Sequence, residues 1–362
     1  MIGSVVYELA PTPNNPRNSE GSFGRAPDGS ILFVYNRYTE GQADDAKADL
    51  AVLTSRDDGR SWENSGIILS ADDLGAMNLM GSSLLTLDNG DFLLFYLFRS
   101  KANRLNMFFR KCLSPDGLKW GNPSVCISHE GYYVVNSDRV IKLENGRLII
   151  PAAFHRNGPS VDGKGDIMDS VAETLYYYSD NNGAYWDVSN KLNLPYTAYF
   201  TSGLQEPGVI ELGNGILYGW ARTDTGRQYE MFSLDSGSTW TTPQPSRFTS
   251  PLSPLSMKRL PDGRIIAVWN PIPIYNGRKE VINGVWTGGR SPLVYAISSD
   301  NGKTFSSPIV IEDDENHGYC YTAIFAGDKN LSLAYCAGGP GDSTCLARIR
   351  IRNIPYDELL IK

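Results

Sequence analysis

Short apolar runs alternate with turn sequences along the whole chain. Runs such as residues 30–35 (SILFVY) and 92–96 (FLLFY) each come shortly after a tripeptide of turn-forming residues. These tripeptides favour hairpin turns, because Gly and Asn tolerate positive φ. Six of them recur, at residues 27–29, 88–90, 144–146, 213–215, 261–263 and 327–329. The pattern predicts an all-β protein built from many short strands.

A second repeat alternates with these turns and has the Asp-box form Ser-x-Asp-x-Gly-x-x-aromatic. It begins at Ser55, Ser233 and Ser298, while a copy at Ser179 carries Asn at the acidic position and one at Ser114 is a residue short. We interpret each box as a folded hairpin corner. Its Asp side chain would bond turn N–H groups, and its aromatic ring would pack between sheets. A metal site is the less favoured interpretation.

Together the two repeats define units of two hairpins, or about four strands each. Six such units predict a six-bladed β-propeller with four-stranded antiparallel blades and Asp-box repeats. No linker divides the chain, so we expect a single domain over residues 1–362. The last unit lacks a box, and its outer strand is expected from residues 5–8 or from residues 347–351. Either strand would close the ring.

The composition argues against several classes of function. The net charge is -7 and the pI about 5.1, so nucleic acid is not an expected partner, since phosphate binding needs a basic surface. No apolar run is long enough to span a membrane. The five cysteines have irregular spacing, which indicates neither a disulfide framework nor a zinc site. No signal peptide is visible, so we expect a cytoplasmic protein, or a secreted one whose signal was removed.

Polar residues recur at two positions that would meet at one mouth of the propeller. Counting back about eight residues from each turn gives Glu20, Met80, Asn136 (with Asp138 and Arg139 next), Gln205 with Glu206, Ser253 and Tyr319. Counting seven to nine residues past each turn glycine gives Arg37, Arg99, His155, Arg222 and Asn270. Together with Arg290, the arginines favour a carboxylate ligand, which Arg binds through paired hydrogen bonds.

The six units and their boxes resemble those of sialidases and related BNR-repeat proteins. The most specific segment is 205–215 (QEPGVIELGNG), followed by Arg222. It resembles the sialidase segment that carries the catalytic Glu and one Arg of a carboxylate-binding triad. The resemblance therefore implies Glu206 and Arg222 in these two roles, and Arg290 as another triad member.

The same resemblance implies a tyrosine nucleophile, which sialidases use in place of a carboxylate. It falls on Tyr319, which the repeat register favours, or on Tyr321, which the usual spacing from the triad Arg favours. The general acid of the family is an Asp on a loop before the first box. That position corresponds to Asp44 or Asp45. No cofactor is implied.

The first unit departs from the family pattern. Sialidases carry a Phe/Tyr-Arg-Ile-Pro motif before the first turn, where this chain has residues 18–23 (NSEGSF), with Glu20 in place of the first triad Arg or its neighbour. Arg37 or Arg17 would replace that Arg. Alternatively the substrate differs from ordinary sialic acid, and Glu20 bonds sugar hydroxyls or acts as the acid.

Three hypotheses follow from this comparison. The first is a sialidase-type glycoside hydrolase that releases a terminal anionic sugar. The second is a glycosidase acting on another acidic sugar, such as a uronic or 2-keto-deoxy acid. The third is a non-catalytic carbohydrate-binding propeller. Retention of Glu206, Arg290 and the tyrosine pair favours an enzyme.

Overall fold

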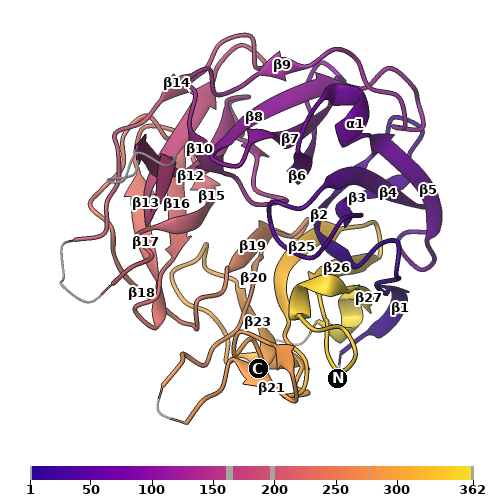
Figure 1. Cartoon of the computed structure of the whole chain (residues 1–362). Coiled ribbons are helices and arrows are strands. Elements are labelled where there is room, and N and C mark those ends of the chain that lie inside the picture. Colours follow the sequence, from indigo (N-terminus) through magenta and orange to yellow (C-terminus); the bar gives the residue numbers. More distant parts are fainter. Residues whose placement is uncertain (1, 160–165, 196–199, 276, 360–362) are drawn as a thin grey trace.

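The computed structural model shows an all-β chain whose sheets are arranged around a common centre (Figure 1). It describes residues 2–159, 166–195, 200–275 and 277–359. Within these ranges the helices are short: α1 (Ala71–Leu74), η1 (Cys345–Ala347) and η2 (Tyr356–Glu358). No helix in the described part is long and apolar enough to cross a membrane. The predicted all-β class is confirmed.

Four sheets have four antiparallel strands each, and three of them use strands that are close in the sequence. The first runs in chain order through β2 (Arg17–Arg25), β3 (Ile31–Tyr38), β4 (Ala48–Ser55) and β5 (Glu63–Leu69). Another has the order β15 (Gln205–Gly213), β16 (Ile216–Arg222), β17 (Arg227–Ser233) and β18 (Gln244–Thr249). The next has the order β19 (Ser256–Arg259), β20 (Ile265–Trp269), β23 (Leu293–Ser298) and β24 (Ile309–Glu312). A small pair, β21 (Val281–Ile282) and β22 (Val285–Trp286), lies between β20 and β23 in the chain.

The second and third repeat units share one nine-stranded sheet instead of forming two separate sheets. Its strands are β6 (Asn78–Thr86), β7 (Phe92–Lys101), β8 (Arg104–Lys111), β9 (Ser124–Val125), β10 (Tyr132–Val134), β11 (Ile141–Lys142), β12 (Leu148–Pro159), β13 (Asp166–Ser179) and β14 (Asp187–Val188). The join is the parallel pairing of β10 with β8, at Tyr132 and Leu105. The second and third units were expected to form separate sheets. They are joined instead, because the short strand β10 pairs with β8 of the second unit and with β12 of the third.

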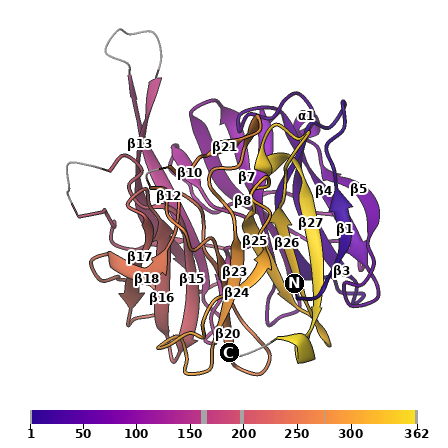
Figure 2. The ribbon, with the colours of Figure 1, turned by 90° about the horizontal axis from the view of Figure 1, so that it is seen from below.

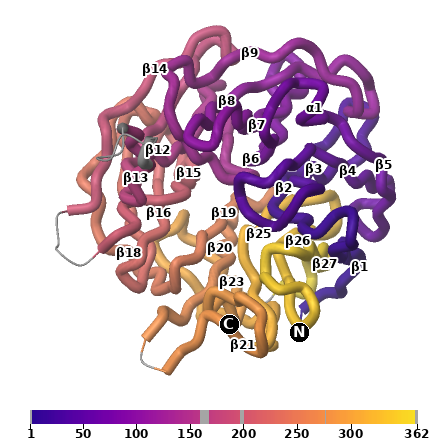
Figure 3. The backbone as a smooth tube through the Cα atoms, in the orientation of Figure 1, coloured from indigo at the N-terminus to yellow at the C-terminus, as the bar shows by residue number. Residues whose placement is uncertain are grey.

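The last sheet combines strands from both ends of the sequence. Its order is β1 (Ser4–Leu9), β27 (Ile349–Pro355), β26 (Asn330–Cys336) and β25 (Cys320–Ala326). Figure 3 shows β1 alongside β27. Both segments that the sequence suggested for this sheet are thus used, with β1 outermost.

Apolar clusters join each repeat unit to the next. One cluster combines Leu32 and Val52 of the first sheet with Leu94 of β7. The last sheet packs on the first in the same manner, where Ile351 shares a cluster with Phe33 and Trp62. Phe33 and Ile351 are buried almost completely, so the first and last units hold each other through a continuous core.

The Asp boxes are folded corners, as their sequence predicts. In the first, Asp57 Oδ1 accepts a hydrogen bond from the Ser61 N–H at 2.9 Å, and the Trp62 ring N–H donates to the Gly59 carbonyl at 3.1 Å. The Trp62 ring packs against Phe23 with centroids 5.6 Å apart. Asp235 and Asp300 accept equivalent bonds. No cluster of three or more metal-ligating side chains occurs in the described residues.

Candidate active site

A cavity of about 170 Å³ opens where the inner strands of several sheets meet. Its lining residues come from β2, β6, β7, β8, β10, β12, β13, β15, β16, β25 and η1, together with the loop after β3 and the segment after β10. β12 and β13 project beyond the other strands on one face (Figure 2), and Met168 of β13 adds to the cavity wall. The polar lining residues are Glu20, Asp44, Arg99, Tyr132, Asn136, His155, Gln205, Glu206, Arg222 and Tyr321.

Tyr321, Glu206 and Arg222 form one contact group in this cavity. The Tyr321 hydroxyl donates a hydrogen bond to Glu206 Oε1 at 2.8 Å. Arg222 pairs with Glu206 Oε2 at 2.9 Å and donates to the Tyr321 hydroxyl at 3.3 Å. Burial and the neighbouring Glu206 carboxylate raise the pKa of Tyr321 well above its ordinary value, although Arg222 opposes this. The phenol therefore carries its proton at neutral pH, with a carboxylate placed to receive it.

Backbone irregularities at the inner strands aim three of these side chains at the centre. Glu20, Glu206 and Tyr321 have φ values of 52°, 46° and 55°. Each lies where the strand register shifts, in β2, β15 and β25 respectively. A β-bulge redirects a side chain out of the alternating pattern, and positive φ is costly for residues other than Gly. Such strain concentrates at functional sites.

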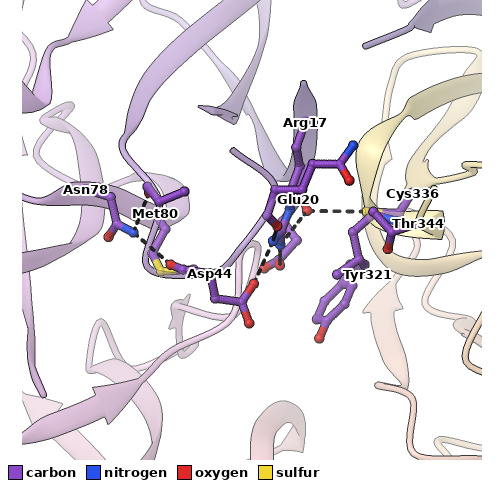
Figure 4. Close-up of polar contacts among 12 residues, drawn as sticks. Arg17, Glu20, Asp44, Asn78, Met80, Tyr321, Cys336 and Thr344 are labelled. Carbon is purple, nitrogen blue, oxygen red and sulfur yellow. Dashed lines mark hydrogen bonds and ion pairs between the residues drawn. The ribbon is translucent and has the colours of Figure 1, made fainter. Parts of the chain in front are cut away.

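A second group of charges lies at the β2 side of the cavity. Arg17 pairs with Asp44 Oδ1 at 2.7 Å and lies 3.8 Å from Glu20 Oε1 (Figure 4). The Arg17 guanidinium also stacks on Tyr38, 4.4 Å from the ring centroid. Burial raises the pKa of Glu20 to about 8, although Arg17 opposes the shift. Burial also acts to raise the pKa of Asp44, but Arg17 outweighs it and holds that pKa below its ordinary value.

Arg99 brings a further positive charge to the cavity. Its guanidinium donates to Asn78 Oδ1 at 3.2 Å, to the Tyr132 hydroxyl at 3.1 Å and to the Asp44 backbone carbonyl at 3.3 Å. These acceptors are neutral. Arg99 is only 2% exposed. A buried cation bonded to neutral acceptors at a cavity wall favours an anionic ligand.

His155 lies beside the Tyr132 ring, with the ring centroids 5.7 Å apart in an edge-on arrangement. Its Nδ1 bonds the Asp169 carbonyl at 2.8 Å. Burial lowers the pKa of His155, and Arg222 adds to that effect. The imidazole is therefore neutral at physiological pH and suits hydrogen bonding to a sugar hydroxyl.

The two candidate tyrosines differ in their surroundings. Tyr319, which the repeat register favours, packs in the apolar cluster between the last two sheets and lies beside His317 and Tyr335. Tyr321 is the one that reaches Glu206. The difference comes from the turn, which is one residue shorter in the last hairpin: Ala326 pairs with Leu331, whereas Arg25 pairs with Ile31 across the first turn. Tyr321 therefore stands as far from Ala326 as Glu20 does from Arg25.

Arg290 lies behind the site rather than in the cavity wall. It is 3% exposed. It donates to the Cys320 thiol at 3.1 Å and to the Leu252 carbonyl at 3.0 Å. Its guanidinium carbon lies over the Tyr321 ring, 5.4 Å from the ring centroid. Arg290 therefore contacts the ring of Tyr321 and not its hydroxyl.

Four other predicted residues do not line the cavity. Asp138 pairs with Lys258 at 3.0 Å and accepts a bond from the Ile324 N–H, linking strands of different sheets. Arg139 donates to the Leu255 carbonyl at 2.6 Å. Both interactions hold inner strands together. Asp45 is exposed beside Asp44, and Arg37 lies on β3 opposite Asp49.

The sequence pattern did not single out Tyr132. It precedes Tyr133 in a short strand, and successive strand residues point to opposite faces. Tyr133 enters the apolar core, while Tyr132 lines the cavity. The signal that could have found it is this paired tyrosine at an inner strand.

The arrangement of sheets is that of a sialidase-like all-β protein, and the comparisons agree. A family profile described as "BNR repeat-like domain" matches residues 38–333. The chain belongs to this family. A search of curated protein sequences gives no match.

Solved structures of sialidases have the same fold at low sequence identity. The Hadza microbial sialidase Hz136 has 15% identity and a TM-score of 0.70, over 96% of this chain and 67% of that chain. The K499G mutant of NanB sialidase from Streptococcus pneumoniae has 13% identity and a TM-score of 0.71, over 99% and 71%. The leech intramolecular trans-sialidase, complexed with 2,7-anhydro-Neu5Ac, has 14% identity and a TM-score of 0.70, over 99% and 71%.

Proposed function

We propose that this protein is a glycoside hydrolase of sialidase type, built on a six-bladed propeller with four-stranded blades, that releases a terminal anionic sugar. One observation carries the proposal: the Tyr321 hydroxyl donates to the Glu206 carboxylate at 2.8 Å inside a cavity. A phenol bonded to a carboxylate at a cavity wall has the geometry of a nucleophile paired with its base. The similarity to sialidase structures supports the same chemistry.

The reaction begins when the Tyr321 oxygen attacks the anomeric carbon and its proton passes to Glu206 Oε1. A phenol suits this role, because the anomeric carbon of a 2-keto acid sugar already bears a carboxylate that would repel a second anion. The glycosidic bond breaks as the leaving oxygen takes a proton from an acid in the cavity. Water then releases the sugar from Tyr321. Glu206 and Arg222 stabilise the charges of the transition state.

The anionic part of the substrate is assigned to the arginines of the cavity. Arg222 lines it from β16 and Arg99 from β7. Arg222 already pairs with Glu206, whereas Arg99 bonds neutral acceptors. Arg99 is therefore the stronger candidate to hold a substrate carboxylate, and His155 and Asn136 are placed to bond sugar hydroxyls.

A second candidate function keeps this chemistry but changes the sugar. Glu20 stands where the sialidase pattern has its first triad Arg or that residue's neighbour, and Arg17 pairs with Asp44. Arg37, the other replacement considered, does not line the cavity. A site that lacks the first arginine of the sialidase triad binds the substrate carboxylate differently. This favours an acidic sugar other than ordinary sialic acid.

The test is hydrolysis of fluorogenic glycosides. An α-sialoside, a glucuronide and a glycoside of a 2-keto-deoxy acid would be compared, with Glu206→Gln and Tyr321→Phe as variants. Release of one anionic sugar, lost in both variants, supports the proposal and identifies the sugar. Arg99→Gln should raise KM by roughly 30-fold, since charge-assisted hydrogen bonds contribute about 2 kcal/mol. Sugar binding without hydrolysis of any substrate would instead indicate a carbohydrate-binding protein.

A further inference from the structure

We propose that Glu20, and not Asp44, protonates the leaving oxygen when the glycosidic bond breaks. This inference rests on the proposed function and names a residue role within it. Glu20 lies on β2 and lines the cavity. Tyr321, Glu206 and Asp44 line the same cavity from other elements. In the view of Figure 4, it lies between Asp44 and Tyr321.

The Glu20 carboxyl is buried but only weakly paired. It is 8% exposed, and its distance of 3.8 Å to Arg17 is too long for a hydrogen bond. The bulge that holds Glu20 at positive φ matches the bulges that hold Glu206 and Tyr321. Three inner strands thus present their irregular residue to one space, and two of these residues form the nucleophile and base.

Asp44 is placed differently. It accepts a hydrogen bond from Arg17 at 2.7 Å, and its side chain is 69% exposed. Arg17 is itself fixed by the Gln42 carbonyl at 2.8 Å and by the Tyr38 ring. An aspartate held by a rigid, buried arginine keeps its negative charge and has no proton to give.

The protonation states agree with this geometry. The pKa of Glu20 is raised to about 8, first by burial and then by the thiol of Cys336 and the carboxylates of Glu206 and Asp44, against the effect of Arg17. Glu20 is therefore protonated at neutral pH. Asp44 is ionised, because Arg17 outweighs the partial desolvation of this carboxyl and holds its pKa below the ordinary value. A general acid needs its proton at the working pH, and pairs of carboxyls with separated pKa values divide the acid and base roles.

Glu20 acts as an acid in the first step of the reaction and as a base in the second. The proton of Glu20 passes to the glycosidic oxygen, which keeps the electron pair of the breaking bond and leaves as an alcohol. The Tyr321 oxygen forms the new bond to the anomeric carbon, and its proton goes to Glu206. In the second step the Glu20 carboxylate takes a proton from water, and the water oxygen bonds to the anomeric carbon. The bond from that carbon to the Tyr321 oxygen breaks, the electron pair stays on the oxygen, and Glu206 returns its proton to it.

Leaving-group dependence tests the assignment. Aryl glycosides with acidic phenol leaving groups need little protonation, whereas alkyl glycosides need a general acid. Glu20→Gln should lose about 100-fold or more in kcat/KM on the alkyl glycoside and much less on the aryl glycoside. Asp44→Asn should lose similar amounts on both, and Glu40→Gln, an exposed carboxyl on the same loop, serves as the control. Wild-type kcat/KM on the alkyl glycoside should fall above about pH 8.

The outcomes are distinguishable. If Asp44→Asn shows the selective loss on alkyl glycosides and Glu20→Gln does not, the assignment of Glu20 is overturned while the hydrolase remains. Equal losses on both substrates in Glu20→Gln also overturn it. If Glu20→Gln fails to fold, Glu20→Asp is compared with wild type on the two substrates, and wild-type kcat/KM is measured against pH on both. The assignment of Glu20 predicts a fall in kcat/KM at alkaline pH for the alkyl glycoside only, and a fall of equal size on both substrates overturns it. A wild type that cleaves no anionic glycoside overturns the proposed function, and the role of Glu20 with it.

Discussion

Replacing Glu20 by Gln should change how stability depends on pH, independently of any catalysis. The folded chain holds the Glu20 carboxyl in a buried position that disfavours its charged form. The unfolded chain exposes it to water, where its pKa returns to 4.5. A pKa that differs between the two states makes the free energy of unfolding depend on pH.

The sign and size follow from the raised pKa of about 8. Stability that depends on neutral Glu20 is fully present below pH 4.5 and is lost as the pH rises through about 8. Each tenfold change in the acid dissociation constant corresponds to about 1.4 kcal/mol, so the whole loss is at most about 5 kcal/mol. Gln carries no charge, so the variant should gain stability relative to wild type across this window.

Chemical denaturation at about pH 4.5 and about pH 9 would measure the effect. The difference in the free energy of unfolding, wild type minus Glu20→Gln, should fall by several kcal/mol between the two conditions. All other titrating groups cancel in this difference to first order. Glu63→Gln, an exposed carboxyl on β5, should show no comparable trend. A flat difference for Glu20→Gln would refute the reasoning, because it would mean that Glu20 ionises in the folded state as readily as in water.

Three further outcomes are expected. Tyr321→Phe should lower kcat by about 1,000-fold or more, whereas the kcat of Tyr319→Phe should stay within a few-fold of wild type. A kinetic assay of both variants measures this. Loss of activity in Tyr319→Phe and not in Tyr321→Phe would reverse the assignment of the nucleophile. Asp57→Ala should lower the free energy of unfolding by about 2 kcal/mol without changing KM, because it removes turn hydrogen bonds far from the cavity; an unchanged melting curve would contradict this. Glu312→Gln should cost about 3 kcal/mol, because it leaves the buried Arg352 charge unpaired; urea unfolding would measure it, and a stable variant would show that the ion pair matters little.

Much of the fold could be predicted because its signals are local. Each hairpin turn and each Asp box is specified by a few adjacent residues, such as Asp57, which bonds an N–H four residues later. The join between β8 and β10 could not be predicted. It rests on one parallel pair, Tyr132 with Leu105, between segments that carry no repeat.

Several residues of the cavity wall could be located from the sequence in two ways. Counting from the turns located Glu20, Asn136 and His155. Glu206 and Arg222 lie together in the cavity, as the 205–215 segment implied. Counting residues from a turn failed for Tyr319, because the last hairpin turn is one residue shorter than the first and the count is displaced accordingly. Position near the mouth also does not fix the orientation of a side chain, since Arg139 bonds the Leu255 backbone carbonyl and does not line the cavity.

The pairing of β1 with β27 has a consequence for the order in which the molecule is assembled during synthesis. Ser4 pairs with Asn353, so this sheet needs both ends of the sequence before its outer edge is complete. The innermost strand of the same sheet, β25, carries Tyr321. Pairings between such distant segments form late, because a long loop must close first. A nascent chain can therefore fold the strand bearing Glu206 well before it presents the tyrosine, and the contact between Glu206 and Tyr321 forms among the last in the molecule.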